Sequence, residues 1–269
     1  MRWYLSTDPP ASAEKNMAKD EYCLRRAIEL GRPILRLYQW QAMTLSLGRN
    51  QKPERQIDLE GCARNGVGLV RRVTGGQAVL HGSDLTYSVT APLRGAGFEG
   101  GIMAIYREIS RAMVAFFEEL GLEPEVKAYT GRERVEMASP VCFATPSAYE
   151  IMIRGRKLVG SAQRLLPDGF LQHGSIPLRA QTPLLARVFL GASEDALEPL
   201  MTDLDSLGLG ALSVEVLQQK LAAAFMGVFG ASGEPLPWGQ ADEAAVAELA
   251  EQYRYWPENP PAAGQRGGP

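Results

Sequence analysis

The sequence predicts an α/β protein of the α+β kind, in which strands fill the middle of the chain and helices follow them. Short runs of extended-type residues, separated by glycine turns, occupy much of residues 34–90. A second group of such runs lies between residues 150 and 178. From residue 182 onward, apolar residues recur at three- and four-residue spacing, which is typical of amphipathic helices.

The first element that we expect is a helix over residues 11–31. Met17, Leu24 and Ile28 fall on one face of it, and Gly31 stands where a helix ends in the left-handed conformation. Strands are then expected over residues 34–40 and 43–47. Residues 68–90 contain two extended runs around each glycine turn, and they predict a meander of strands.

The most regular apolar pattern of the chain predicts a helix over residues 102–120, and we expect the polar residues 123–141 to be irregular. A hairpin with its turn at residues 154–156 is expected next, followed by a strand over residues 170–178. The expected C-terminal helices are these: 183–190 with Thr182 as cap, 194–207, 213–229 with Ser213 as cap, and 242–255.

Composition and charge narrow the classes of protein to which the chain can belong. Its 269 residues are 45% hydrophobic, with a formal net charge of −3, so no positive field exists to hold nucleic acid. The longest apolar run, residues 221–229, is less than half of the roughly 20 residues that a membrane-spanning helix needs. Residues 1–10 contain no signal-peptide apolar region either, so we expect a cytoplasmic protein, a monomer that binds neither nucleic acid nor membrane. Its three cysteines are too few for a disulfide framework and lack metal-binding spacing.

The densest group of unusual residues surrounds the pair Gly75 and Gly76. A Gly-Gly turn lets the backbone approach a ligand closely, and adjacent Arg71 and Arg72 favour an anion nearby. A phosphate- or carboxylate-binding turn is one interpretation. The alternative is a tight hairpin with exposed arginines, because Gly-Gly is also a favoured hairpin pair.

Two histidines and three cysteines are the other candidates for chemistry. His81 and His173 each precede a glycine at the end of an extended run, and each is either structural or part of a site. No recognised spacing builds a metal site from them. Cys142 lies between two prolines, where it is accessible, and Lys157 is a candidate for the cation that a reactive thiolate needs, although a lysine beside a turn is commonly just solvated.

Several stretches together resemble the lipoate and biotin protein ligase superfamily, and within it the LipM-type octanoyltransferases. They run in order over roughly residues 16–178. The stretches are residues 16–21 (NMAKDE), 35–40 (LRLYQW), 45–51 (LSLGRNQ), 71–89, 142–150 (CFATPSAYE), 155–164 (GRKLVGSAQR) and 172–175 (QHGS).

The resemblance implies a mixed, largely antiparallel sheet flanked by helices, with a helical C-terminal portion. It implies a catalytic domain over residues 1–240, with its core at about 30–235, and a helix and disordered tail over 241–269. The implied activity is transfer of octanoate from octanoyl-acyl carrier protein to a lysine of a lipoyl-accepting protein, such as the glycine-cleavage H protein. Cys142 would carry the acyl group as a thioester, and Lys157 would lower the pKa of that thiol.

The resemblance also implies a set of substrate-binding residues. They are Arg72, Thr74, Gly75, Gly76, Gln77, Ala78, Val79, His81, Gly160, Ser161, Ala162, His173 and Gly174. We further expect the acyl chain to lie in an apolar slot lined by Val70, Val73, Val79 and Leu85. A basic patch from Arg71, Arg154, Arg156 or Arg164 would dock the acidic acyl carrier protein, unless these arginines are merely solvated.

Three alternatives to this activity remain open. The first is an ATP-dependent lipoate–protein ligase, whose turn commonly has a third glycine where this chain has Gln77 and which needs no cysteine at position 142. The second is an octanoyl transferase that works between two lipoyl-domain proteins, and the third is a non-catalytic acyl-binding relative. Because a thioester donor needs no activation, we expect no ATP, no other cofactor and no metal.

Overall fold

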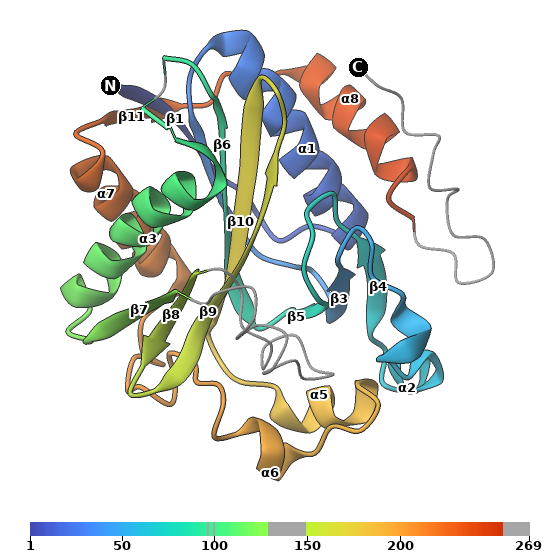
Figure 1. Ribbon diagram of the computed structural model, residues 1–269. Coiled ribbons are helices and arrows are strands. Elements are labelled where there is room, and N and C mark those ends of the chain that lie inside the picture. The colour runs from blue at the N-terminus through green and yellow to red at the C-terminus, as the bar shows by residue number, and fades with distance from the viewer. Residues whose placement is uncertain (96, 99, 129–148, 255–269) are drawn as a thin grey trace.

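A mixed eight-stranded sheet runs through the molecule, with strand order β11-β1-β2-β6-β10-β9-β8-β7 (Figure 1). The computed structural model describes residues 1–95, 97–98, 100–128 and 149–254. The strands of this sheet are β1 (Arg2–Thr7), β2 (Ile34–Tyr38), β6 (Asp84–Pro92), β7 (Pro124–Ala128), β8 (Tyr149–Ile153), β9 (Arg156–Leu165), β10 (Gly169–Pro177) and β11 (Ser232–Pro235). Only β11-β1 and β1-β2 pair in parallel, so the sheet is largely antiparallel, as expected.

A second, three-stranded sheet has the order β4-β3-β5, with bounds Gly68–Arg71, Thr44–Leu47 and Val79–His81. Its central strand β3 is parallel to β4 and antiparallel to β5. The expected meander over residues 68–90 is therefore wrong, because β4 and β5 are separated by β3 and β6 joins the large sheet. The Gly75–Gly76 turn does not close a hairpin either, since the strands on its two sides are not paired with each other.

Helices cover both faces of the large sheet (Figure 1). Helices α3 and α7 lie on one face, and α1 lies on the other with α8 packed against it. The helical segments are α1 (Ala13–Leu30), the 3-10 turn η1 (Pro53–Arg55), α2 (Leu59–Arg64), α3 (Gly101–Glu119), α5 (Thr182–Val188), α6 (Glu194–Leu197), α7 (Val214–Val228) and α8 (Gln240–Glu251). In the described part of the chain, no helix combines the length and the apolarity that a membrane crossing requires.

Three of the predicted helices are confirmed, and their local signals explain why. Helix α1 ends at Gly31, whose φ of 64° is the left-handed cap expected there. Helix α7 begins after Ser213, whose side chain accepts a hydrogen bond from the backbone N–H of Val216. Helix α3 buries its apolar stripe in the largest core cluster, against the sheet and α7.

Four local predictions differ from the structure. The helix expected over residues 194–207 stops at Leu197, because Pro199 removes a backbone donor and disfavours helix in the residue before it. Residues 124–128 form the edge strand β7 instead of irregular chain. The N-cap of α5 is Gln181, not Thr182. Helix α8 spans Gln240–Glu251 and packs on α1, burying Val246 and Leu249 in the cluster that holds residues of α1.

Candidate active site

The candidate site lies where α1, the three-stranded sheet and the loop after β4 meet one face of strands β6 and β10. In the register of these strands, His173 of β10 pairs with Ser88 of β6. Because side chains alternate along a strand, His173 points toward α1, whereas its neighbours Gln172 and Gly174 point toward Tyr87 on the opposite face. The buried side chains on the α1 face are polar to an unusual degree.

His173 connects α1 to the loop after β4. Its Nδ1 lies 2.8 Å from Oδ2 of Asp20, and its Nε2 lies 2.7 Å from Oγ1 of Thr74. Burial lowers the pKa of His173; the charge of Asp20 opposes this, but the charge of Arg72 adds to it. The imidazole is therefore neutral at physiological pH, and it bridges segments that are far apart in the sequence.

His81, at the end of β5, makes the same kind of bridge. Its Nδ1 lies 2.8 Å from Oδ2 of Asp84, and its Nε2 lies 2.9 Å from Oγ of Ser46 on β3. The ring of Trp40 stacks on the His81 ring, with centroids 4.1 Å apart. Burial alone would raise the pKa of Asp84, but its interaction with His81 and the hydrogen bonds from Ser175 and the Gly82 backbone N–H lower it on balance.

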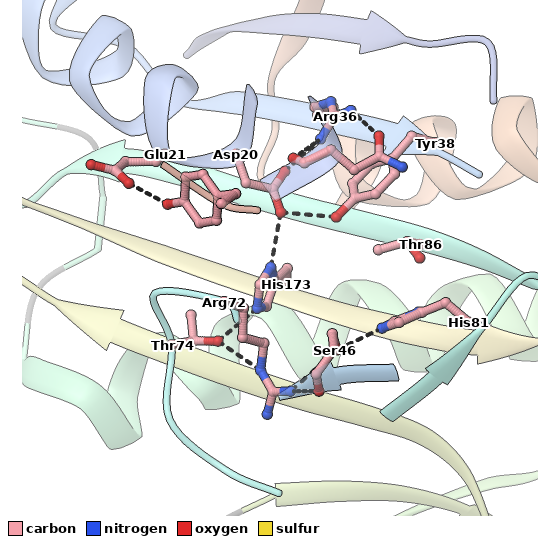
Figure 2. Close-up of polar contacts among 12 residues, drawn as sticks. Asp20, Glu21, Arg36, Tyr38, Ser46, Arg72, Thr74, His81, Thr86 and His173 are labelled. Carbon is pink, nitrogen blue, oxygen red and sulfur yellow. Dashed lines mark hydrogen bonds and ion pairs between the residues drawn. The ribbon is translucent and has the colours of Figure 1, made fainter. Parts of the chain in front are cut away.

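Arg72 joins the two histidine bridges (Figure 2). Its Nε donates to Thr74 Oγ1 at 3.0 Å, and its Nη1 donates to both the carbonyl and the hydroxyl of Ser46. Its Nη2 donates to the carbonyl oxygens of Gly75 at 2.7 Å and Gln77 at 2.8 Å. The guanidinium is buried behind the Gly75–Gly76 turn. Its five N–H donors all bind protein oxygen atoms in these contacts.

Asp20 ties the site to the first strands of the sheet. Its Oδ1 accepts from Nη1 of Arg36 at 2.7 Å, and its Oδ2 accepts from the hydroxyl of Tyr38 at 2.8 Å (Figure 2). Burial would raise the pKa of Asp20, but the hydrogen bond from His173 and the charge of Arg36 lower it on balance. Arg36 also contacts Asp8 of the loop after β1, so one buried cation is shared by two carboxylates.

The turn at Gly75 and Gly76 packs against a second turn that begins at Gly48. A Cβ atom at Gly48 would overlap the carbonyl group of Gly76, so only glycine allows this approach. The backbone N–H of Arg49 donates to the carbonyl of Thr74 at 2.8 Å. Gly76 has a φ of 89°, which also favours glycine. The two turns thus form one structural unit.

Of the remaining predicted substrate-binding residues, Ser161 and Gly174 face each other on adjacent strands. They are register partners in β9 and β10, with Gly160 and Ala162 on either side of Ser161. The Ser161 hydroxyl lies 2.8 Å from the hydroxyl of Tyr87. A side chain at position 174 would come within 2.6 Å of the Tyr87 ring, so this region is closely packed.

Lys157, the predicted catalytic lysine, lies at the start of β9 and is buried. Its ammonium pairs with the buried carboxylate of Glu150 on β8. The backbone of Lys157 is fixed as well, because its N–H donates to the Leu200 carbonyl at 3.0 Å and its carbonyl accepts from the Thr202 N–H at 2.9 Å. Such a charge, held in place away from water, acts strongly on a neighbouring group.

The predicted nucleophile Cys142 lies outside the described residues, so its distance from Lys157 is not part of this geometry. The other two cysteines are buried, and burial raises the pKa of the Cys23 thiol to about 12 and that of Cys62 to about 11. Neither forms a thiolate near neutral pH. Burial therefore makes both of them structural residues.

The expected apolar slot is not formed by the four residues assigned to it. Val70 and Val73 belong to the cluster with α1 and α8, Val79 packs in the cluster with α5, and Leu85 lies in the cluster with α3. These residues face three different cores, and the prediction that they line one slot is wrong. Strand identity alone did not show which way each side chain points.

The arginines expected to form a basic patch have different surroundings. The Arg71 guanidinium donates to the backbone carbonyls of Gly48 at 2.9 Å and Gln51 at 2.8 Å, so it holds the turn that faces Gly76. Arg154 is exposed in the hairpin turn with a φ of 50°, and Arg156 is half-buried two residues later. Arg164 is half-buried on β9. Docking of a partner at these positions remains a prediction.

Sequence reasoning singled out the two histidines but missed the acidic and hydroxyl groups that hold them. Asp20 falls on the same face of α1 as Met17 and Leu24, and a carboxylate on an apolar face was the available signal. Asp84, Ser46 and Glu150 carry no comparable signal, because only the tertiary fold brings them to their partners. Among the described residues, no three His, Cys, Asp or Glu side chains are arranged to hold a metal ion.

The sequence is similar to several proteins of one family. The chain is 35% identical over 260 residues to octanoyltransferase LipM of Moorella thermoacetica, covering 93% of this chain and 95% of that protein. It is 40% identical over 178 residues to octanoyltransferase LipM of Carboxydothermus hydrogenoformans, covering 66% of this chain and 65% of that protein.

The fold has a close structural counterpart. A solved archaeal lipoylation system from Thermoplasma acidophilum, a bipartite lipoate protein ligase and its E2 lipoyl domain, superimposes with a TM-score of 0.76 at 20% identity, over 93% of this chain and 92% of that one. The profile of the family described as lipoyl protein ligase A/B catalytic domain matches residues 12–226, which is most of the sequence. The chain therefore belongs to the lipoyl protein ligase A/B catalytic domain family.

Proposed function

We propose that this protein transfers an octanoyl group from octanoyl-acyl carrier protein to a lysine of a lipoyl-accepting protein. The relatives named octanoyltransferase LipM support octanoyl transfer, and the match to the Moorella thermoacetica protein covers 93% of this chain. The structural observation that carries the proposal is the buried Lys157 ammonium, paired with Glu150 at the start of β9. A fixed cation of this kind suits the stabilisation of a thiolate and of an oxyanion.

The first half-reaction is a thioester exchange on Cys142. The Cys142 thiolate attacks the octanoyl carbonyl carbon of the donor, the bond from carbon to the donor sulfur breaks, and the donor leaves as a thiol after taking up a proton. One thioester replaces another of similar energy, so the step needs no ATP. Lys157 favours the thiolate over the thiol by its charge.

The second half-reaction forms an amide. A lysine of the acceptor attacks as a neutral amine, the bond between the acyl carbon and the Cys142 sulfur breaks, and the amine proton goes to the released thiolate or to solvent. Lys157 or a backbone N–H of the Gly75–Gly76 turn stabilises the tetrahedral oxyanion. The turn from Thr74 to Val79 and the facing residues Ser161 and Gly174 would hold the acyl group.

Two kinds of partner follow from this scheme. The donor is an acyl carrier protein, and the acceptor is a lipoyl-domain protein, in keeping with the E2 lipoyl domain named with the solved archaeal ligase. A chain that relies on a free thiol works best in a reducing compartment, which favours the cytoplasm. We propose that it acts as a monomer, without ATP, another cofactor or a metal.

Intact-protein mass measurement after mixing the purified chain with octanoyl-acyl carrier protein, without ATP, tests this function. We expect one octanoyl adduct that hydroxylamine removes. The Cys142→Ser variant should form no thioester, whereas Cys62→Ala should form it as the wild type does, because Cys62 is buried elsewhere.

Three results would contradict the scheme. If no adduct forms and transfer requires ATP, Mg²⁺ and free acid, the protein is a ligase. If the enzyme accepts octanoate from an octanoylated lipoyl domain but not from acyl carrier protein, the assigned donor is wrong. Initial-rate plots that intersect when donor and acceptor are varied, instead of the parallel lines of a ping-pong reaction, would exclude the covalent route.

A further inference from the structure

Seven buried side chains from distant parts of the sequence form one continuous chain of hydrogen bonds. In order they are Asp20, His173, Thr74, Arg72, Ser46, His81 and Asp84. None of them is more than 6% exposed. The order of groups is symmetric, because each half consists of a carboxylate, an imidazole and a hydroxyl and ends on the same guanidinium. Figure 2 shows this series of hydrogen bonds from Asp20 to His81.

The donor and acceptor of each hydrogen bond in this series follow from the groups that can only donate, such as Arg72, or only accept, such as the two carboxylates. A guanidinium has only donors, so Thr74 and Ser46 must each accept from Arg72. Each hydroxyl then has a single hydrogen left, and the imidazole Nε2 is the acceptor within reach, at 2.7 Å and 2.9 Å respectively. An ionised carboxylate can only accept, so the single ring proton of each neutral imidazole lies on Nδ1 and leaves Nε2 bare to accept from the hydroxyl. The carboxylate oxygen that accepts each ring proton lies 2.8 Å from Nδ1.

We propose that Asp20–His173 and Asp84–His81 are two positioning pairs that fix Arg72, and that Arg72 in turn fixes the conformation of the turn from Gly75 to Ala78. Each imidazole is held in one tautomer by its carboxylate, and each orients one hydroxyl toward the guanidinium. Asp20, Asp84 and Ser46 thereby become part of the machinery of the site. The histidines act through Arg72 rather than by touching the substrate.

The turn shows what this arrangement achieves. Nη2 of Arg72 draws the carbonyls of Gly75 and Gln77 inward. In a trans peptide the N–H of the next residue points away from the preceding carbonyl, so the N–H groups of Gly76 and Ala78 face away from the guanidinium. Two fixed backbone donors of this kind suit a carbonyl oxygen, and that the oxygen is the octanoyl carbonyl rests on the function proposed above.

The protonation pattern has a direct test that does not depend on activity. The chain contains only two histidines, so ¹⁵N labelling of histidine yields four ring-nitrogen signals in the full-length protein. Near pH 7.5 we expect one pyrrole-type and one pyridine-type nitrogen per ring, with the proton on Nδ1. Thr74→Val should shift the Nε2 signal of His173, and Ser46→Ala should shift that of His81. An Nε2–H tautomer or an imidazolium in either ring overturns the proposal.

The link to catalysis is tested with two isosteric substitutions. Thr74→Val removes one of the two hydroxyls that contact Arg72. Thr90→Val removes a buried hydroxyl on β6 that has no hydrogen-bond partner among the described residues. With octanoyl-acyl carrier protein we expect Thr74→Val to raise KM about tenfold with a much smaller change in kcat, because the buried network has lost the two hydrogen bonds of this hydroxyl. Thr90→Val should behave as the wild type does, and Thr74→Ser should recover most of the loss.

The possible outcomes separate this proposal from the function on which it rests. Equal kinetics for Thr74→Val and Thr90→Val would show that the series of hydrogen bonds does not control the turn from Gly75 to Ala78. If the wild type forms no acyl adduct, the proposed function fails, and the tautomer measurement still decides whether the two pairs position Arg72.

Discussion

Replacement of Gly48 by alanine tests whether the close packing of the two turns controls activity. The backbone of Gly48 lies outside the left-handed region, so alanine brings no conformational penalty of its own. Its Cβ would, however, overlap the Gly76 carbonyl oxygen and lie only 2.8 Å from the Gly76 carbonyl carbon. Ordinary carbon–carbon contacts are about 3.5–4.0 Å, so the carbonyl carbon alone requires the Gly75–Gly76 turn to retreat by about 1 Å, and the overlapping oxygen requires more.

A displacement of that size predicts a large loss of rate with a moderate loss of stability. A misplacement of about 1 Å can cost roughly 100-fold in activity, and overpacking costs about 1–3 kcal/mol in the free energy of unfolding. We expect kcat/KM for octanoyl transfer to fall about 100-fold, while urea denaturation still shows a cooperative transition.

Gly227→Ala is the matched control for Gly48→Ala. A Cβ at Gly227, in the last turn of α7, meets no atom within 4 Å. Alanine there should raise the free energy of unfolding by about 0.5–1 kcal/mol and leave turnover unchanged. A folded Gly48→Ala variant with kcat/KM close to that of the wild type would refute the view that the position of this turn limits the reaction.

Three further perturbations test other parts of the structure. The pKa values of Asp8 and Asp20 are lowered, so the stability that these carboxylates contribute is present near neutral pH and is lost as the pH falls below about 4. Urea midpoints should drop in that range, and Asp8→Asn should reduce the drop. Urea midpoints that do not change with pH would contradict this. Glu150→Gln removes the carboxylate beside buried Lys157, so it should lower the free energy of unfolding by about 3 kcal/mol and slow the acylation of Cys142. Wild-type stability in this variant would mean that the Lys157–Glu150 ion pair is dispensable. Ser213→Ala removes the N-cap of α7 and should cost about 1 kcal/mol in thermal or urea melts with normal turnover; loss of turnover would show that this cap acts beyond local stability.

Sequence signals that are local predicted the structure well. Helices α1 and α3 follow from apolar residues at three- and four-residue spacing, and the hairpin of β8 and β9 follows from extended runs around the Arg154–Gly155 turn. Strand β11, in contrast, has the sequence SGEP, which contains no strand pattern. It is a strand because β1 lies beside it in parallel register, and no local rule predicts a pairing across more than 200 residues.

The candidate site divides in the same way. Arg72, Thr74, His81 and His173 stand out by residue type and by their places in the resembling stretches, and the structure brings them together. Their partners come from other elements, so only the tertiary arrangement of α1, β3 and β6 identifies Asp20, Ser46 and Asp84. Residue type indicated where the chemistry is, whereas the assignment of acceptors and donors required the fold.

The place of β1 between β2 and β11 has a consequence for how the chain folds during synthesis. Trp3 is fully buried, with its ring centroid 4.7 Å from that of Phe229, and the Ser232 N–H donates to the Met1 carbonyl. During synthesis Trp3 leaves the ribosome more than 200 residues before Phe229 does. Strand β1 must therefore wait, uncovered on one edge, until β11 has emerged. We expect the last cooperative folding step to follow release of the C-terminal helices, and nascent chains stalled before α7 to need chaperone protection.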